Sequence, residues 1–210
     1  MSFLEKTRLD LAAIRANDPA ARSLFEIILT YSGFWAVVYH RLAHFFYRHN
    51  YKLIARIISV WARFLTGIEI HPGAKLGTGV FIDHGSGVVI GETAVVGNNV
   101  TIYQGVTLGG TGKEKGKRHP TIKDNVMISA GAKLLGSFTV GEGAKIGAGS
   151  VVLSEVPPYA TVVGIPGRIV RLNGEKCDNL DHSLPDPIWD ELNKINRQIE
   201  DIVERLQNKK

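Results

Sequence analysis

An aliphatic residue recurs at every sixth position through the central part of the chain. The thirteen positions are Ile70, Leu76, Ile82, Ile90, Val96, Ile102, Leu108, Ile122, Ile128, Leu134, Val140, Ile146 and Val152. A period of six fits neither an α-helix nor a strand that alternates at every second residue. A hexapeptide repeat is typical of a parallel β-helix, and the small residue that often follows the aliphatic one lets the chain turn each corner.

The repeat is interrupted twice. The first interruption lengthens one interval from six to eight residues, with the surplus in residues 83–87, and the second lengthens another to fourteen, with a predicted loop over 109–120. Insertions in a solenoid leave its body on one face and often form the binding site. Each interruption contains a histidine, His84 or His119. We therefore expect the chemistry of the protein at these two places.

Helical patterns precede the repeat, over residues 1–66. Ser2 and Glu5 have the spacing of a capping box at the start of a first helix. Asp18 is expected to cap a second helix whose first residue is Pro19. Helices this short bury little surface alone. We expect them to cover the open N-terminal end of the solenoid, where exposed strand edges would invite aggregation.

A heptad pattern follows the repeat, in residues 188–210. Its apolar positions, spaced alternately four and three apart, are Ile188, Leu192, Ile195, Ile199, Ile202 and Leu206. Such a short helix gains little stability alone, and isoleucine at both core positions favours trimers or tetramers over dimers. The segment is expected to oligomerise. The alternative is an amphipathic helix that folds back on its own subunit.

These patterns together predict an α+β fold. A short N-terminal helical cap occupies residues 1–66, and a parallel β-helix with the catalytic residues occupies 67–171. A polar connector follows over 172–187, before the oligomerising helix of 188–210. A length of 210 residues suits one or two domains.

Composition and charge narrow the function classes. The net charge of +5 and the pI near 9.3 suit an anionic small molecule as well as a polyanion. The sequence contains no phosphate-binding P-loop motif, and nucleic-acid binding is not predicted. It contains neither a cysteine cluster nor an HExxH-like motif, so no metal site is predicted.

The expected location is the cytoplasm. The single cysteine, Cys177, argues against a disulfide framework and is compatible with a reducing compartment. The N-terminal segment is charged and lacks the pattern of a cleaved signal peptide. The most apolar run, residues 24–39, is interrupted by Glu26 and Gly33 and is shorter than the roughly 20 residues that span a bilayer. A buried helix is therefore favoured over membrane association.

Motifs in and around the two interruptions resemble those of a known family. They are Ile68-Glu69-Ile70-His71-Pro72-Gly73-Ala74, Asp83-His84, Val106-Thr107-Leu108-Gly109-Gly110-Thr111-Gly112, Arg118-His119-Pro120 and Gly164-Ile165-Pro166-Gly167-Arg168-Ile169-Val170. Together they resemble the serine O-acetyltransferases, which transfer acetyl from acetyl-CoA to L-serine in cysteine biosynthesis. The resemblance covers about residues 8–171 and implies a left-handed β-helix. The general chirality rule would favour the right hand.

The resemblance implies that His84 is the catalytic base. A serine hydroxyl is a poor nucleophile, and a positioned imidazole can take its proton during attack on a thioester. Glu69 stands where the family commonly has aspartate, in the role of orienting the imidazole. The glutamate is one methylene longer, so its contact with His84 is open. Glu69 as a plain exposed carboxylate is the alternative.

The resemblance also implies an amino-acid site. Asp18 and Asp83 would bind the α-ammonium group, and the guanidinium fork of Arg118 would bind the α-carboxylate with help from His119. Two simpler interpretations stay open. Asp18 could be only a helix cap, and Arg118 with His119 could be only part of a solvated basic run.

The co-substrate implied is acetyl-CoA, with no metal. In the family the pantetheine arm lies in a groove between neighbouring β-helices, against small residues and backbone amides. The residues expected along the arm and the phosphates are Gly110, Thr111, Ala130, Lys145, Ala148 and Arg168.

Two rival functions stay open at this point. One is an acetyltransferase of the same fold acting on a sugar or another amino acid, which would not need Asp18 and Asp83 around an ammonium group. The other is a non-catalytic scaffold, which would not need His84 or the pair Arg118 and His119.

The resemblance also implies partners. We expect a homotrimer with its active sites between subunits, and L-cysteine as a feedback inhibitor at the serine site. Many family members bind O-acetylserine sulfhydrylase through a terminal isoleucine. This chain ends in Asn208-Lys209-Lys210, so no complex by that route is predicted.

Overall fold

The computed structural model describes residues 1–112, 115–176, 194–195 and 197–199. The chain divides into two units, Met1–Asp178 and Asn179–Lys210. In the second unit, the described residues 194–195 and 197–199 are helical. The remaining positions of the predicted heptad pattern lie outside the described residues.

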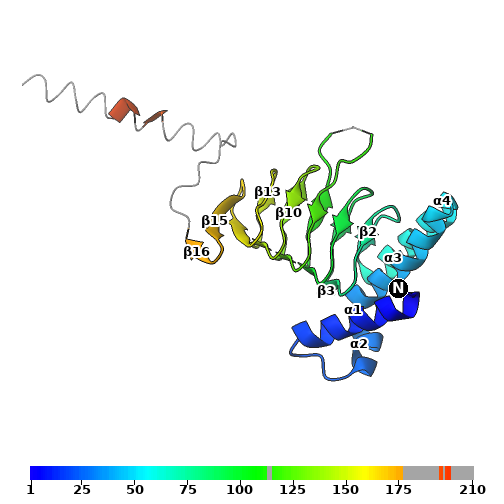
Figure 1. Ribbon diagram of the computed structural model, residues 1–210. Coiled ribbons are helices and arrows are strands. Elements are labelled where there is room, and N and C mark those ends of the chain that lie inside the picture. Colours follow the sequence, from blue (N-terminus) through cyan, green and yellow to red (C-terminus); the bar gives the residue numbers. More distant parts are fainter. Residues whose placement is uncertain (113–114, 177–193, 196, 200–210) are drawn as a thin grey trace, which may run out of the picture. The chain divides into compact units, whose positions relative to one another are not determined.

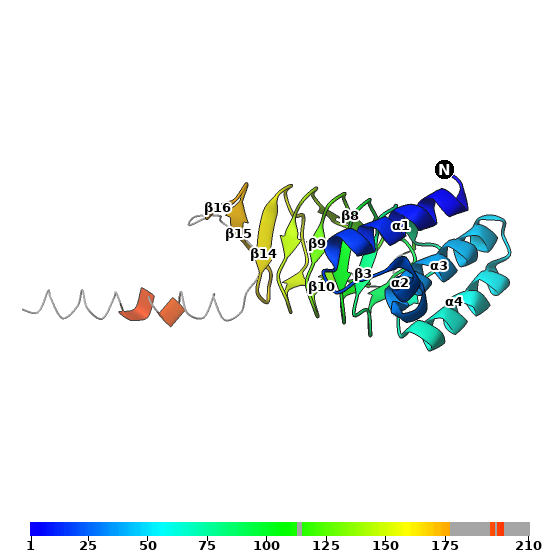
Figure 2. The same cartoon turned by 90° about the horizontal axis from the view of Figure 1, so that it is seen from below.

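The first unit contains a β-solenoid with three sheets (Figures 1 and 2). Sheet A contains, in order, β1 (Glu69–Ile70), β4 (Val89–Ile90), β7 (Thr107–Gly109), β10 (Lys133–Leu135) and β13 (Val151–Val152). Sheet B contains β11 (Thr139–Val140), β8 (Thr121–Ile122), β5 (Val95–Val96) and β2 (Lys75–Leu76). Sheet C contains β16 (Glu175–Lys176), β15 (Arg168–Leu172), β14 (Ala160–Val163), β12 (Lys145–Ile146), β9 (Met127–Ile128), β6 (Thr101–Tyr103) and β3 (Phe81–Asp83). Pairing is parallel up to β14 and antiparallel between β14, β15 and β16.

The six-residue repeat sets the register of the sheets, as predicted. In sheet A the paired positions are Ile70, Ile90, Leu108, Leu134 and Val152. Twelve of the thirteen aliphatic positions are buried, and Leu76 is partly buried against the same core. A second apolar position, two residues earlier in the repeat, was not predicted. Its buried members include Ile68, Ala74, Val80, Val88, Val100, Val106, Val126, Ala132 and Phe138.

Four helices precede the solenoid: α1 (Phe3–Asn17), α2 (Leu24–Thr30), α3 (Ser32–Arg48) and α4 (Lys52–Thr66). The capping box of Ser2 and Glu5 is present. The prediction that Asp18 caps a second helix is wrong. Asp18 is the C-cap of α1, and Ser23 caps α2. The Asp18 carboxylate instead accepts hydrogen bonds from the Ala20 N–H (2.8 Å) and the Tyr31 hydroxyl (2.5 Å), which leaves residues 18–23 outside any helix.

The helices cover the first coil of the solenoid, as predicted. Asp10 of α1 is fully buried and forms an ion pair with Arg41 of α3 at 2.6 Å. Asp10 also accepts the Gly79 N–H at 2.8 Å, while Arg41 donates to the Gly77 carbonyl at 3.1 Å. Burial raises the pKa of Asp10, and the Arg41 charge opposes that rise. The ion pair therefore ties both helices to the coil.

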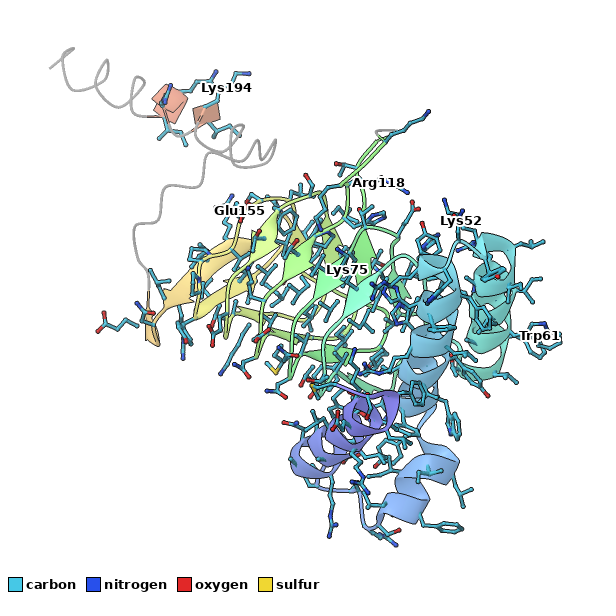
Figure 3. All side chains as sticks on the ribbon, turned by 45° about the vertical axis from the view of Figure 1, so that its right-hand side comes forward. Lys52, Trp61, Lys75, Arg118, Glu155 and Lys194 are labelled. Atoms are coloured by element: carbon cyan, nitrogen blue, oxygen red, sulfur yellow. The ribbon has the colours of Figure 1, made fainter. Side chains whose placement is uncertain are left out.

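Helix α4 has two unlike faces. Its small residues Ala55, Ser59 and Ala62 are buried, and the Ser59 hydroxyl donates to the Ile70 carbonyl at 2.8 Å. The opposite face is apolar and exposed, with Leu53, Ile54, Ile57, Val60, Trp61, Phe64 and Leu65. Figure 3 shows Trp61 projecting away from the helix. Within the described residues, no helix combines the length and the apolarity that a membrane span requires.

The Asp10–Arg41 pair generates a stability prediction. Replacing Asp10 with alanine should lower the free energy of unfolding by about 3 kcal/mol, because it leaves the Arg41 guanidinium buried without a counter-charge. Urea denaturation measures this loss. Glu5→Ala, at an exposed position of the same helix, is the matched control and should cost about 1 kcal/mol or less. Equal losses for the two variants would contradict the role given to the ion pair.

Candidate active site

His84 lies in the turn that follows β3. Its backbone has φ = 50°, in the left-handed region that few residues other than glycine occupy. The side chain is 79% exposed, and its Nε2 lies 3.7 Å from Asp83 Oδ1. Backbone strain of this kind concentrates at functional sites. The imidazole is therefore accessible to a substrate and lies beside a carboxylate.

Asp18, at the end of α1, and Tyr31, at the start of α3, lie near His84 and Asp83. The Tyr31 hydroxyl and the Ala20 N–H lower the pKa of Asp18, and the charge of His84 contributes a smaller part. The hydrogen bond to Asp18 raises the pKa of Tyr31 to about 12, with a further contribution from Asp83. The end of α1, the start of α3 and the end of β3 therefore meet around His84. Sequence reasoning missed Tyr31, because nothing local in the sequence links it to Asp18.

Glu69 lies in β1 and forms an ion pair with Arg63 of α4, at 2.8 Å. Within the described residues, no hydrogen bond joins Glu69 to His84. The two residues nevertheless belong to one corner of the solenoid, since the Gly87 N–H donates to the Gly67 carbonyl at 3.0 Å. The structure thus brings Glu69 to the corner of His84 without a contact between them.

Arg118 belongs to a second group of polar residues. Its Nη2 lies 2.6 Å from Glu92 Oε2, and the Tyr47 hydroxyl donates to the same carboxylate at 3.0 Å. These hydrogen bonds lower the pKa of Glu92, which keeps it ionised. Figure 3 shows Arg118 at the base of the long loop. Glu92 and Tyr47 therefore orient a guanidinium that remains partly exposed.

His119 is held in one tautomer by Thr93. The Thr93 hydroxyl oxygen accepts the N–H groups of Arg118 (3.0 Å) and His119 (3.2 Å), so its own proton points to His119 Nδ1 at 2.8 Å. The Thr93 N–H also donates to Nδ1, at 3.2 Å. Burial, together with the charges of Arg118 and Lys117, lowers the pKa of His119. The ring is thus a buried, neutral imidazole that carries its proton on Nε2 and lies against Gly91.

The two groups lie on different edges of the solenoid. His84 follows a strand of sheet C and precedes β4 of sheet A, whereas residues 109–120 connect β7 of sheet A to β8 of sheet B. The loop leaves the body of the coil after β7 (Figure 1). Asp18, Asp83 and His84 therefore share one edge, and Arg118 with His119 shares another. One chain does not bring all five residues together.

The residues expected at the coenzyme are divided in the same way. Ala130 and Ala148 follow strands of sheet C, on the His84 edge, while Gly110 and Thr111 lie on the Arg118 edge. Lys145 and Arg168 belong to strands of sheet C, β12 and β15.

A row of glycines runs along the His84 edge. Its glycines, each with φ between 68° and 74°, are Gly87, Gly105, Gly131 and Gly149. A Cβ added to each of the first three would lie 3.5–3.9 Å from the Cα of the next. Glycine adopts this conformation without steric cost and leaves the backbone open to a ligand.

Two sequence families match parts of the solenoid. "Bacterial transferase hexapeptide (six repeats)" matches residues 119–154, and "Hexapeptide repeat of succinyl-transferase" matches residues 85–104. A hexapeptide solenoid with a histidine in an interruption of the repeat defines the class of hexapeptide-repeat acyltransferases.

Relatives of known name match nearly the whole chain. The serine acetyltransferase of Bacillus subtilis (strain 168) is 58% identical over 210 residues, which cover 99% of this chain and 97% of the relative. That of Staphylococcus epidermidis (strain ATCC 12228 / FDA PCI 1200) is 56% identical over 200 residues, or 94% of each. The chain belongs to the serine acetyltransferase family and is an acyltransferase.

Solved structures of the same family are similar. Soybean serine acetyltransferase complexed with serine has a TM-score of 0.79 and 49% identity, covering 80% of this chain and 70% of that one. A serine acetyltransferase in complex with cysteine has a TM-score of 0.80 and 45% identity, covering 83% and 68%.

Tyr31→Phe should raise the pKa of Asp18, because the variant lacks the hydroxyl that stabilises the ionised carboxylate. In the wild type this stabilisation is present at neutral pH and is lost as the pH falls through the pKa of Asp18. Carbon-13 NMR titration of the Asp18 carboxyl group measures the change. Tyr39→Phe, elsewhere on α3, is the control. An unchanged Asp18 titration in Tyr31→Phe would remove Tyr31 from the site.

Thr93→Val should release the His119 ring, because valine has the shape of threonine but no hydroxyl. The N–H groups of Arg118 and His119 lose their acceptor, which should cost about 2 kcal/mol of stability. Nitrogen-15 NMR should show His119 as the Nε2–H tautomer in the wild type and a larger share of the Nδ1–H tautomer in the variant, where only the backbone N–H of position 93 still donates to Nδ1. Thr93→Ser keeps the hydroxyl and should behave as the wild type; a wild-type spectrum for Thr93→Val would contradict the assignment.

Proposed function

We propose that the protein transfers the acetyl group of acetyl-CoA to the hydroxyl of L-serine, forming O-acetylserine for cysteine biosynthesis. Membership of the serine acetyltransferase family over almost the whole chain carries this proposal. The chemistry of the two polar groups supports it. The carboxylates of Asp18 and Asp83, beside the imidazole of His84, suit the ammonium and hydroxyl groups of serine. The guanidinium of Arg118 and the N–H of His119 suit its carboxylate.

His84 acts as the general base in this proposal. It removes the hydroxyl proton of serine as the oxygen attacks the carbonyl carbon of the thioester. The tetrahedral intermediate then collapses, the C–S bond breaks, and the imidazolium returns the proton to the departing CoA sulfur. The Asp83 carboxylate lies 3.7 Å from the ring, beside the place where this positive charge develops. Glu69 would orient His84 only if its carboxylate left the ion pair with Arg63 and contacted the imidazole instead.

The amino-acid substrate is bound by both groups. Asp18 and Asp83 bind its ammonium, and Asp18 presents a carboxylate already oriented by Tyr31. Arg118 binds the carboxylate, and His119 adds its Nε2–H. A sugar has neither ionic group, so it leaves these four residues without partners. This argument favours an amino acid over a sugar as the acceptor.

Acetyl-CoA binds along the His84 edge. The glycine backbone leaves room for the pantetheine arm beside Ala130 and Ala148, and Lys145 and Arg168 would bind the phosphates. Gly110 and Thr111 would contact the coenzyme from the Arg118 edge of a neighbouring copy. No metal is required by this chemistry.

A complete site needs two copies of the chain, because the two groups lie on different edges. A contact that joins the His84 edge of one copy to the Arg118 edge of the next is heterologous, and such contacts form a closed ring when the rotation between copies closes. We propose a ring of three. L-cysteine has the ammonium and carboxylate groups of serine, so it should bind the same residues and inhibit in competition with serine.

Subunit mixing tests the shared site. His84→Ala and Arg118→Ala should each lower kcat/KM at least ~100-fold. In trimers assembled from equal amounts of both, about one quarter of the sites combine an intact His84 edge with an intact Arg118 edge, so activity should return to about a quarter of wild type. A mixture of His84→Ala and Asp83→Ala, two changes on one edge, is the control and should stay inactive.

Release of free CoA with serine, other amino acids and sugars as acceptors tests the reaction itself. Turnover with a sugar but not with serine would overturn the acceptor. No turnover with any acceptor would favour the non-catalytic scaffold. Failure of subunit mixing alone would overturn the shared site and leave the reaction in place.

A further inference from the structure

A hollow of about 290 Å³ lies between α1, α3 and β2, apart from the residues assigned to catalysis. Helix α1 contributes Lys6, α3 contributes Arg48, and β2 contributes Lys75. Figure 3 labels Lys75 on the first coil. No aspartate or glutamate is among the described residues that line it.

The cations of the hollow are not neutralised by the protein. Lys6, Arg48 and Lys75 form no ion pair with any described residue, whereas Arg41, which also lines the hollow, is paired with Asp10. Three like charges around one hollow give it a positive potential, and a concave surface strengthens their combined field. This potential favours an anion in the hollow.

The wall of the hollow also has unsatisfied polar atoms. Among the described residues, the buried side-chain nitrogens without a hydrogen-bond partner are His40 Nδ1 and Arg41 Nε, and both residues line the hollow. His40 Nε2 lies 3.2 Å from the Ala74 carbonyl, and burial lowers the pKa of His40 to about 3, so the ring is neutral. Buried polar groups are normally paired. Neither atom is exposed to the hollow, so the positive charge there comes from the three unpaired cations.

The size of the hollow limits the ligand. A volume of about 290 Å³ is at the lower end for small-molecule sites and is too small for a coenzyme with an adenine and a pantetheine arm. We propose that the hollow binds a small, multiply charged oxyanion: sulfate, phosphate or a phosphate monoester. Guanidinium and ammonium groups are the usual ligands of such ions.

Binding would act on the candidate active site through α1. Lys6 lies in the first half of this helix, and Asp18 caps its C-terminal end. An anion held between Lys6 and Lys75 links α1 to the first coil, in addition to the Asp10–Arg41 pair. The expected result is a cap that resists unfolding and an Asp18 that is held in place.

Calorimetry and thermal unfolding test the proposal. The full-length protein is saturated with CoA, which occupies the proposed coenzyme phosphate sites, and is titrated with sodium phosphate, sodium sulfate and glycerol phosphate. Sodium chloride at equal ionic strength is the reference. We expect saturable binding of one oxyanion per chain and a Tm that rises with its concentration. Tighter binding of glycerol phosphate would identify a phosphorylated metabolite as the ligand, and tighter binding of phosphate or sulfate the inorganic ion.

Arg48→Ala and Lys75→Ala should each weaken oxyanion binding about 10-fold. Lys123→Ala removes an exposed lysine outside the hollow and should leave binding unchanged. Equal effects of chloride and phosphate, or equal losses in Lys123→Ala, would overturn the proposal. Binding lost in Arg168→Ala but kept in Arg48→Ala would place the anion at the coenzyme site instead. CoA release by Arg48→Ala, assayed without oxyanion, should match the wild type, so this test is independent of the proposed reaction.

Discussion

The inward stacking of one aliphatic residue per hexapeptide is the constraint on which the rest of the structure depends. Each of these residues packs on the equivalent residue of the next coil, and the backbone hydrogen bonds between coils hold that register. A shift of one residue would turn every aliphatic side chain outward. The inward positions of each face are therefore fixed by packing and have no freedom to carry chemistry. The edges, where the chain turns, have that freedom.

The repeat, the loop after Leu108 and the capping box could be predicted, because each depends on residues close together in the sequence. The division of the site between two edges was also encoded. Hexapeptides in a solenoid take the three faces in turn, so counting them places His84 after a sheet C strand and Arg118 after a sheet A strand. The expectation of active sites between subunits came from the family resemblance, and the order of the faces gives it a physical basis.

Side-chain partners across the fold could not be predicted. Tyr31 is thirteen residues from Asp18 and Glu92 is twenty-six from Arg118, and neither pair has a local pattern that links it. The partner of Glu69 could not be predicted either. Its carboxylate can reach more than one cation or imidazole, and the position of α4 brings Arg63 to it. Asp18 is a different case. Its sequence context suits a helix N-cap, but the hydroxyl of Tyr31 competes for the carboxylate, and the helix starts later.

The coils are evenly spaced, so equivalent positions along the His84 edge recur at a fixed distance. Neighbouring strands lie about 4.8 Å apart, so the three steps of sheet C from β3 through β6 and β9 to β12, the strand of Lys145, span about 14 Å. The separation between the strand before His84 and the strand of Lys145 is therefore a whole number of coils. A chain with one coil fewer would present the same side chains at a separation about 5 Å shorter. The number of coils therefore selects the length of the extended molecule that can reach both ends at once.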